Sequence, residues 1–597
     1  MKPSYGYHKF CSIFLTGMLI FSLSGCSKFS VRNQSQLEGF PIDSNVSTTL
    51  ERTLAPGPKP SAAITLGEVS KYGPSGYGNW TYGPGLPYEK RLDIMPATYS
   101  DSAVTKKMKF LNFFAISDIH TTDKESPNQL IFLQRRLPTF PVGASLYSGI
   151  MLYTTHVLDA AVQTANALHR KDNKANPFDF GISLGDTCNT TQYNELRWYI
   201  DVLDGKVITP SSGAHLGADT IDYQKLYKAA GLDKSIPWYQ TIGNHDHFWM
   251  GSIPVDHSLR KDLRQSYLTG EVFAAGDVLA DLRKIDSRDY YMGVLDGSTP
   301  YGDIKFAGPV GDFSTPPKVA ADPDRRSLLR TEWMKEFFKT SSSPAGHGFS
   351  MTDAQNGFAC YSFVPKSNIP LKVIVLDDTQ KEDDGSIDIH GHGFLDQARW
   401  SWLKKELADG DAAGQLMIIA AHIPVGVEET APNSEMGWWT DPQNAVTLPD
   451  LVAELQSHPN LLMWMAGHRH LNTVKAFLSP DPVHAPEKGF WHVETPSLRD
   501  FPQQFRTFQI YLNSDYSLSI VTTSVDPAVK EGTPAAISRK YAVAAAQIVG
   551  TWDLTTKYNP TNDPTVKPMP TGSYNAELVK QLSPAMKAKM QTLYPTP

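Results

Sequence analysis

The chain has 597 residues, of which 41% are hydrophobic and 20% are charged, and it carries a formal net charge of −7. This composition is sufficient for one large domain or two ordinary ones, and it excludes global disorder. Because the sequence has no long basic run, it also argues against a surface that binds duplex nucleic acid. The balance is typical of an acidic globular enzyme.

The first 25 residues have the features of an export signal. Lys2 and Lys9 form a short cationic start, and an apolar stretch follows from Phe10 to Leu23, too short for a typical membrane span. The ending Leu-Ser-Gly-Cys resembles a bacterial lipobox, which implies cleavage before Cys26 and attachment of a lipid to its sulfur. We therefore expect an exported, membrane-anchored lipoprotein, in the outer membrane or facing the periplasm of a Gram-negative host and otherwise on the cell surface. The alternative is an ordinary secretory signal.

Residues 26–105 are expected to be a tether and wrapping segment. They are rich in Gly, Pro, Ser and Tyr, a composition that rarely forms regular elements. The aromatic residues in the later part indicate that it packs on the folded domain. Of the four cysteines, only Cys188 and Cys360 lie in the folded part, and the sequence does not decide whether they form a disulfide.

From residue 107 onward, short apolar runs alternate with helical patterns, which favours a layered α/β fold. The expected strands are residues 110–116, 178–184, 238–242, 371–376, 416–420 and 461–465. The expected helices include residues 144–169, 194–203, 396–407 and 448–456. After residue 470 the pattern changes to strands alone, at 489–495, 507–512 and 518–523. The last 70 residues are expected to be partly helical, around 535–548 and 575–593.

Five of the six expected strands end in a short polar motif. In open α/β sheets, sites form beyond the carboxyl ends of the strands, so we expect these motifs to meet at one edge of a sheet. Carboxylates and imidazoles are suitable ligands for Mn, Fe, Zn or Ni, and a carboxylate can bridge two ions. In chain order, the polar residues are Asp118, His120, Asp186, Asn244, His245, Asp246, His422, His468 and His470.

Each motif alone is more often a turn or a structural feature, but their order is specific. The series Asp-x-His, Gly-Asp, Gly-Asn-His-Asp, His and Gly-His-x-His resembles the calcineurin-like metallophosphoesterases over about residues 107–525. The resemblance implies an α/β double β-sheet sandwich flanked by helices in four layers. It divides the chain into a signal at 1–25, a tether at 26–105, a domain at 106–527 with an insertion at about 247–370, and a partly helical extension at 528–597.

The resemblance also implies roles for the motif residues around two divalent or trivalent metal ions. His245 matches a histidine that does not bind metal and lies near the scissile phosphate, and Asp246 matches the acid that orients it. Asp186 matches the carboxylate that bridges the two ions. The remaining ligands would be Asp118, His120 and His470 for one ion and Asn244, His422 and His468 for the other.

The implied activity is hydrolysis of a small phosphate ester, either a monoester or a diester. The alternatives are a nuclease that acts on single strands and a catalytically silent surface binding protein. Asn189 stands where purple acid phosphatases place a tyrosine ligand, which argues against a tyrosinate–iron site. Arg499 or Arg506 could contact a substrate phosphate, although a structural salt bridge is the favoured interpretation. His247, His390 and His392 are candidates for structural or site-rim residues.

Overall fold

The computed structural model describes residues 37–595, with gaps at residues 44–45, 139–145, 256, 279, 383–390, 426–442 and 551–572. The expected signal, Cys26 and His390 lie outside the described residues. Within the described part of the chain, no helix is long and apolar enough to cross a membrane. Residues 38–597 belong to one compact unit.

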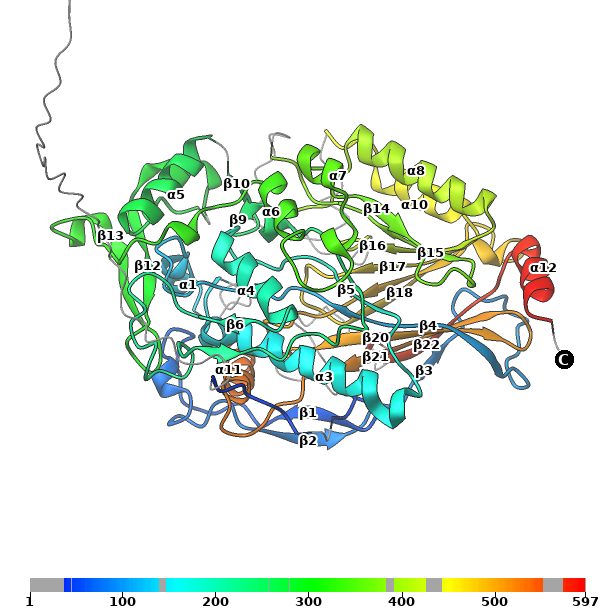
Figure 1. Ribbon diagram of the computed structural model, residues 1–597, viewed down its shortest axis with the longest axis horizontal. Helices are drawn as coiled ribbons and strands as arrows, with labels where there is room; N and C mark the ends of the chain where they lie inside the picture. The colour runs from blue at the N-terminus through cyan, green and yellow to red at the C-terminus, as the bar shows by residue number, and fades with distance from the viewer. Residues whose placement is uncertain are drawn as a thin grey trace, which may run out of the picture. The chain divides into compact units, whose positions relative to one another are not determined.

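A seven-stranded sheet carries the first three motifs. β4, β5 and β8 are parallel neighbours. β20 lies antiparallel on the other side of β4 (Figure 1). Across the sheet the order is β3 (Glu89–Arg91), β22 (Asn575–Lys580), β21 (Leu518–Val525), β20 (Phe505–Asn513), β4 (Lys106–Ile116), β5 (Phe180–Ser183) and β8 (Trp238–Gln240). The first three motifs therefore leave the sheet at the carboxyl ends of three adjacent parallel strands.

A six-stranded sheet carries the other two motifs. The order across it is β14 (Tyr361–Phe363), β15 (Leu371–Val375), β16 (Leu416–Ala420), β17 (Leu461–Ala466), β19 (Phe490–Glu494) and β18 (Thr473–Phe477). The four central strands are parallel and fully buried, which explains their continuous apolar sequences. His422 and the last motif follow two of these strands.

Alternate residues of the six-stranded sheet enter two different cores, as the two-residue period of a strand requires. Ile418 and Met463 belong to a large cluster that also contains Phe113 of the seven-stranded sheet. Ile419 and Trp464 belong to a second cluster, with residues of α8 (Gln397–Ala412) and α10 (Leu448–Ser457). Figure 1 shows these two helices together beside β15 and β16. Strands and helices thus bury both faces of this sheet.

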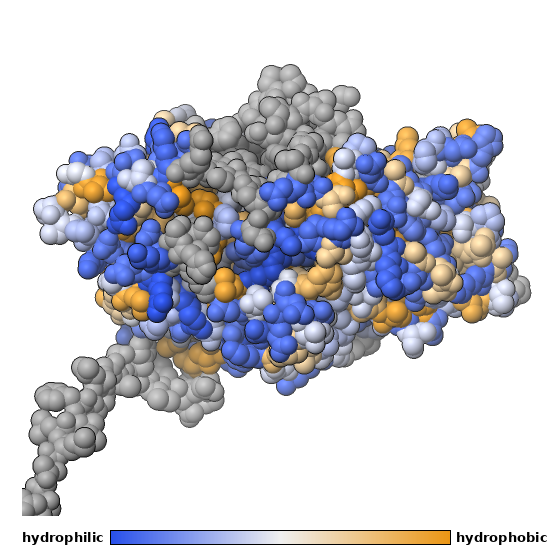
Figure 2. Space-filling model, turned by 90° about the horizontal axis from the view of Figure 1, so that it is seen from above, coloured by the Kyte–Doolittle hydropathy of each residue, from blue (hydrophilic) through white to orange (hydrophobic). Residues whose placement is uncertain are grey.

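Two further helices pack into the large cluster: α3 (Thr154–Lys174) and α4 (Tyr193–Leu203). A third cluster joins the N-terminal strands β1 (Arg52–Pro56) and β2 (Trp80–Pro84) to α11 (Pro534–Val549), which Figure 1 shows side by side. The later part of the expected tether therefore packs on the folded chain. On the face in Figure 2, hydrophobic residues lie in separate patches among hydrophilic ones, as on an ordinary protein surface.

The segment between the third motif and β15 contains its own small elements. They are β9 (Phe248–Trp249), β10 (Ile253–Pro254), α5 (His257–Thr269), β11 (Ala274–Ala275), β12 (Tyr290–Asp296), β13 (Asp303–Pro309), α6 (Arg330–Glu336) and α7 (Met351–Asn356). The remaining short elements are α1 (Ile131–Arg136), β6 (Val207–Ile208), β7 (Tyr227–Lys228) and α12 (Pro584–Leu593). The insertion begins at the site, because the Gly251 carbonyl accepts a hydrogen bond from the Asn244 side chain.

The mixed α/β class is confirmed, and each of the six expected strands exists, but two expectations were wrong. The motifs leave two sheets rather than one. Residues 575–580 form β22, not a helix, because this segment pairs with β21 along its length. Its Ala, Glu, Leu and Lys residues favour a helix, but tertiary pairing overrides that propensity. The helix begins only at Pro584, after the Ser583 side chain caps it.

Another difference concerns the start of an expected helix. The helix expected from residue 144 is a 3-10 turn at Gly149–Tyr153 before α3 begins at Thr154. The strands after residue 470 divide between the two large sheets: β18 and β19 join the six-stranded sheet, and β20 and β21 join the seven-stranded one. Cys188 and Cys360 are buried and free.

Candidate metal centre

The turns that carry the motifs have an unusual backbone. Asp118, His120, Asp186, His468 and His470 all have positive φ, between 45° and 75°. L-residues rarely adopt this left-handed conformation, and it persists only where the surrounding structure imposes it, commonly at functional sites. The backbone therefore aims these five side chains at a cost in local strain.

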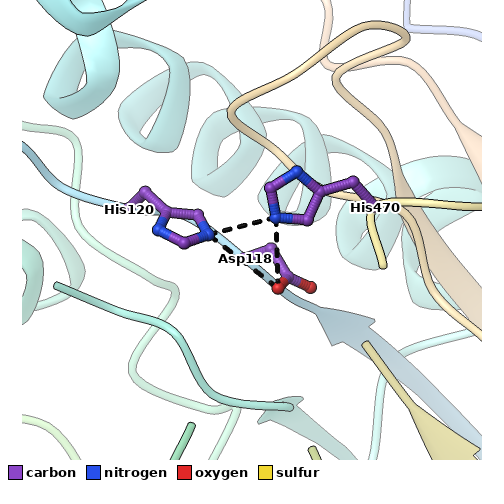
Figure 3. A group of neighbouring side chains, drawn as sticks. All are labelled: Asp118, His120 and His470. Atoms are coloured by element: carbon purple, nitrogen blue, oxygen red, sulfur yellow. Dashed lines mark hydrogen bonds and ion pairs between the residues drawn. The ribbon is translucent and has the colours of Figure 1, made fainter. Parts of the chain in front are cut away.

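Three side chains form the first group of facing donor atoms (Figure 3). His120 Nε2 lies 3.1 Å from His470 Nε2, and Asp118 Oδ1 lies 3.5 Å from His470 Nε2 and 3.9 Å from His120 Nε2. Asp118 and His120 come from the turn after β4, and His470 comes from the turn after β17. The seven- and six-stranded sheets thus both contribute to one set of ligand atoms.

The Asp186 carboxylate lies between this group and a second one. Its Oδ2 is 3.6 Å from His120 Nε2 and 3.3 Å from His422 Nε2. Its Oδ1 accepts a hydrogen bond of 2.8 Å from the backbone N–H of His245. One oxygen is therefore held by the protein, and the other faces histidines on both sides, which is the geometry required of a bridging carboxylate.

The second group is built around the side-chain oxygen of Asn244. This Oδ1 lies 2.9 Å from His422 Nε2 and 3.2 Å from His468 Nδ1. The Asn244 amide nitrogen donates to the Gly251 carbonyl, so that the oxygen is the atom turned towards the histidines. Asp186, His422 and His468 also place ligand atoms within 4.8 Å of one another.

The electrostatics of the site show how strongly its groups interact. Burial alone would lower the pKa values of His422 and His470. The Asp186 carboxylate outweighs this effect at His422 and raises its pKa to about 10. The carboxylates of Asp118 and Asp500 do the same at His470, whose pKa also rises to about 10. Burial and the neighbouring His245 hold the pKa of His120 well below its usual value.

The donor set fits metal ions in its chemistry. Imidazole nitrogens, carboxylate oxygens and one amide oxygen face one another at buried or half-buried positions. Two of the ring nitrogens, on His120 and His470, lie only 3.1 Å apart. Such groups stabilise a bound cation, and mixed N and O ligation suits Mn, Fe, Zn or Ni.

Hydrogen bonds on the outer side of two rings fix which nitrogen faces the site. His422 Nδ1 lies 2.7 Å from the carbonyl oxygen of Leu184, and His470 Nδ1 lies 2.6 Å from Asp500 Oδ2. In each case Nδ1–H donates outward, which leaves the Nε2 lone pair for a ligand bond. Asp500 was not among the residues predicted from the sequence, because no motif marks it.

His245 is oriented differently from the prediction. Its Nδ1 lies 2.8 Å from the backbone carbonyl oxygen of Asn189, and its ring meets the His120 ring edge-on at 4.5 Å. Burial lowers its pKa. A backbone carbonyl leaves no trace in the sequence, so this contact could not be predicted.

Asp246 holds a turn and not the His245 ring, which corrects the orienting role expected for it. Its carboxylate accepts hydrogen bonds from the Thr187 hydroxyl and from four backbone N–H groups. Those four N–H groups belong to Gly243, Asp186, Thr187 and Cys188. Although these bonds favour the ionised form, burial and the nearby Asp186 raise the pKa of Asp246 to about 7. Asp246 therefore fixes the second and third motifs against each other.

The other candidate residues have structural contacts. Arg506 is fully buried and donates to Asn472, Thr522 and three backbone carbonyls, away from the metal ligands. Arg499 is also buried, and its Nη1 donates to Asn189 Oδ1 at 2.7 Å. It thus contacts the residue that orients His245.

Of the three histidines expected to be structural or site-rim residues, the two that the structure describes, His247 and His392, are buried. His247 contacts Glu382 and Thr379 through its two ring nitrogens, each at 2.9 Å. His392 donates its backbone N–H to Gln380 Oε1. His247 therefore belongs to a separate polar cluster.

The known structures compared below share little sequence with this chain. No family model matches the sequence, and no curated protein matches it. One similar solved structure is a dimetal phosphatase from Danio rerio, with 13% identity, coverage of 70% of this chain and 97% of that one, and a TM-score of 0.33. Another is PhoD, with 9% identity, coverage of 79% and 80%, and a TM-score of 0.30. The function is therefore inferred from the side chains of the site.

Proposed function

We propose that this protein is a metal-dependent hydrolase of phosphate esters with a dinuclear metal centre. The observation that carries the proposal is the Asp186 oxygen that faces His120 on one side and His422 on the other. When bound, two such ions activate water as a nucleophile near neutral pH and stabilise charge on the phosphoryl oxygens. The ions would be Mn, Fe, Zn or Ni.

The ligands divide into two positions, which we name by their residues. The first position consists of Asp118, His120 and His470. The second position consists of Asn244, His422 and His468. Asp186 is shared between them. This division rests on the two groups of facing ligand atoms that contain His470 and His468, and for Asn244 on its contacts with His422 and His468.

His245 is the residue that would give a proton to the leaving oxygen. Its Nδ1 is committed to the Asn189 carbonyl, so Nε2 is the nitrogen that can hold a transferable proton. Gly251 packs against this edge of the ring, and an added Cβ at that position would collide with it. The observed position of the His245 ring therefore requires a residue without a side chain at position 251.

The proposed architecture is a double β-sheet sandwich with helices outside. Its support is the hydrophobic cluster common to both large sheets, together with α8 and α10 on the other face of the six-stranded sheet. This arrangement would bring the carboxyl ends of β4, β5 and β8 to those of β16 and β17. The substrate would then bind where the two sheets meet.

The function can be tested with three substrates in parallel. We expect hydrolysis of p-nitrophenyl phosphate or bis-p-nitrophenyl phosphate with Mn²⁺, its loss after chelation and its return when Mn²⁺ is restored. Activity on single-stranded DNA alone would favour a nuclease. An absence of turnover on all three, in protein that contains metal, would favour a surface binding protein of the same fold.

We also propose that the enzyme is exported and lipid-anchored through Cys26, on the basis of the charged start, the apolar run and the Leu-Ser-Gly-Cys ending. The substrate would then be a small phosphate ester outside the cytoplasm. Cys26→Ser should release the protein from the membrane fraction or leave the signal uncut. If membrane fractionation and the mass of the N-terminal peptide are both unchanged, the anchor is wrong.

A further inference from the structure

The carbonyl oxygen that orients His245 belongs to a peptide bond that is also held at its other end. This bond joins Asn189 to Thr190 and is trans, and its oxygen lies 2.8 Å from His245 Nδ1. Its N–H donates to Glu195 Oε2 at 2.8 Å. Because the C=O and N–H of a trans peptide point in opposite directions in one rigid plane, Glu195 fixes the direction in which the oxygen faces His245.

The Glu195 carboxylate is fully buried and is surrounded by donors. Its Oε2 also accepts hydrogen bonds from the backbone N–H of Asn189 and from the Thr190 hydroxyl, each at 3.1 Å. Its Oε1 accepts from the backbone N–H of Asp123 at 2.9 Å and from the Gln192 side chain at 3.2 Å. These donors favour the ionised form, whereas burial opposes it and raises the pKa of Glu195 to about 7. Above that pH, Glu195 places a negative charge against the N–H of the orienting peptide.

A charged acceptor at one end of an amide strengthens the hydrogen bond at the other end. Hydrogen bonds in a chain polarise one another, and they do so more strongly where water is excluded. Here the chain runs from Glu195 through the Asn189–Thr190 peptide to the His245 ring. The peptide oxygen is thereby a stronger acceptor, which keeps Nδ1 protonated and leaves Nε2 to exchange a proton with a substrate.

Two further supports make this arrangement rigid. Glu195 lies in the first turn of α4, whose Leu196 side chain is buried in the large cluster. On the other side, the Asn189 side chain accepts a hydrogen bond from Arg499 Nη1 at 2.7 Å and donates one to Gln129 Oε1 at 3.2 Å. A group that holds a reacting ring in place needs such support from packed elements and from neighbouring hydrogen bonds.

We propose that Glu195 is a positioning residue that acts on His245 through the Asn189–Thr190 peptide. This inference rests on the proposed function, in which His245 gives a proton to the leaving oxygen. Glu195 thereby takes the orienting role that was expected of Asp246, whose carboxylate holds a turn instead. Loss of the Glu195 charge should therefore slow the reaction only where His245 must transfer a proton.

The experiment compares a poor and a good leaving group on Mn²⁺-loaded protein at pH 8, where Glu195 is mostly charged. The substrates are phenyl phosphate and p-nitrophenyl phosphate, or the corresponding diesters if the wild type prefers them. Glu195→Gln keeps the size of the side chain but removes its charge and adds N–H groups among the donors. It should lower kcat for the phenyl ester by about 10²-fold, the loss caused by a misplacement of about 1 Å. The p-nitrophenyl ester should lose far less, and KM and bound Mn²⁺ should not change.

Two further variants separate positioning from other effects. Glu336→Gln is the matched control, because Glu336 is also buried but pairs with Arg197 and Lys339. It should lower stability and leave the ratio of the two rates unchanged. In a His245→Ala background, Glu195→Gln should no longer change that ratio, because the residue that it positions is gone.

Failure of this inference and failure of the proposed function give different results. If Glu195→Gln slows both esters equally, slows neither, or loses Mn²⁺, the inference is overturned although the proposed function stands. If metal-loaded wild-type protein hydrolyses neither ester, the proposed function fails and the inference with it. If Glu195→Gln is misfolded by circular dichroism, Glu195→Asp decides, because it keeps the charge but draws the carboxylate back from the peptide. A loss confined to the phenyl ester then supports the inference, and equal losses reject it.

Discussion

Two largely buried polar clusters of this protein are built on opposite principles. In the charge cluster of Arg330, Asp377, Glu382 and Arg399, opposite charges pair directly. Arg330 forms ion pairs with Asp377 and Glu382, and Arg399 lies 3.1 Å from Asp377. The candidate metal centre instead brings imidazole and carboxylate ligand atoms face to face. In the charge cluster the opposite charges neutralise one another, whereas the facing ligand atoms would be stabilised by a bound cation.

His245 in the third motif and His247 just after it show the same contrast. His247 uses both ring nitrogens, with Glu382 and Thr379, and therefore belongs to the charge cluster. His245 uses Nδ1 for the Asn189 carbonyl. The hydrogen-bonding of the ring, and not its place in a motif, thus separates a structural histidine from one available for chemistry.

Asp186→Asn should have the largest effect, because one carboxylate serves both metal positions. We expect loss of both ions and a fall in turnover greater than the ~10²–10⁴-fold typical of a single general acid–base group. Elemental analysis and p-nitrophenyl phosphate hydrolysis provide the two measurements. Asp409→Asn, in an exposed pair with Lys405, is the control. A variant that kept two ions would show that Asp186 is not the bridge.

His245→Ala should leave the metal content intact and slow hydrolysis by ~10²–10⁴-fold for substrates with poor leaving groups. The loss should shrink for p-nitrophenyl phosphate, because p-nitrophenolate scarcely needs a proton. Rates across a series of leaving groups, with metal analysis of the same samples, test this. Loss of metal would make His245 a ligand, and equal losses for all leaving groups would make it an electrostatic contact.

Arg330→Met tests the charge cluster, where the effect should appear in stability and not in metal binding. Removing one partner from a buried ion pair costs about 3–5 kcal/mol, because a charge remains buried without compensation. Urea unfolding of metal-free protein measures this loss. Arg326→Met, which breaks an exposed pair with Asp324, should cost less than ~1 kcal/mol. Equal costs for the two variants would remove the distinction between the clusters.

The sequence was sufficient to place the strands that hold the site, because buried parallel strands are continuous apolar runs with a clear end. Phe110–Ile116 and the run at Leu461 were identified by that pattern alone. It could not show that β4 and β17 belong to different sheets, since strand pairing is decided by contacts far apart in the chain. For the same reason, the segment that begins at Asn575 was mistaken for a helix.

Within the site, the sequence identified side chains that belong to motifs and missed those that only support them. The seven proposed ligand side chains lie together in the structure. That they bind metal ions remains a prediction. Asp500 was missed because it lies in a loop without a motif, 30 residues after the histidine that it contacts. Asp246 was expected to contact the His245 ring, but its carboxylate accepts hydrogen bonds from backbone N–H groups, which no sequence motif reveals.

His458 forms ion pairs near the surface, and its substitution should have the smallest effect on stability. It lies 2.6 Å from Asp411 and 3.4 Å from Glu454, and these acids are 27% and 30% exposed. Burial lowers the pKa of His458, but the two acids outweigh it and raise the pKa above its ordinary value. The stabilisation is therefore complete below the unfolded pKa of about 6.5 and disappears as the pH rises through the folded pKa.

His458→Gln should destabilise the protein more at pH 5.5 than at pH 9, by no more than ~1 kcal/mol because the acids are partly exposed. Urea unfolding at both pH values measures the difference, and a larger loss at pH 9 would mean that His458 stabilises the fold as a neutral ring.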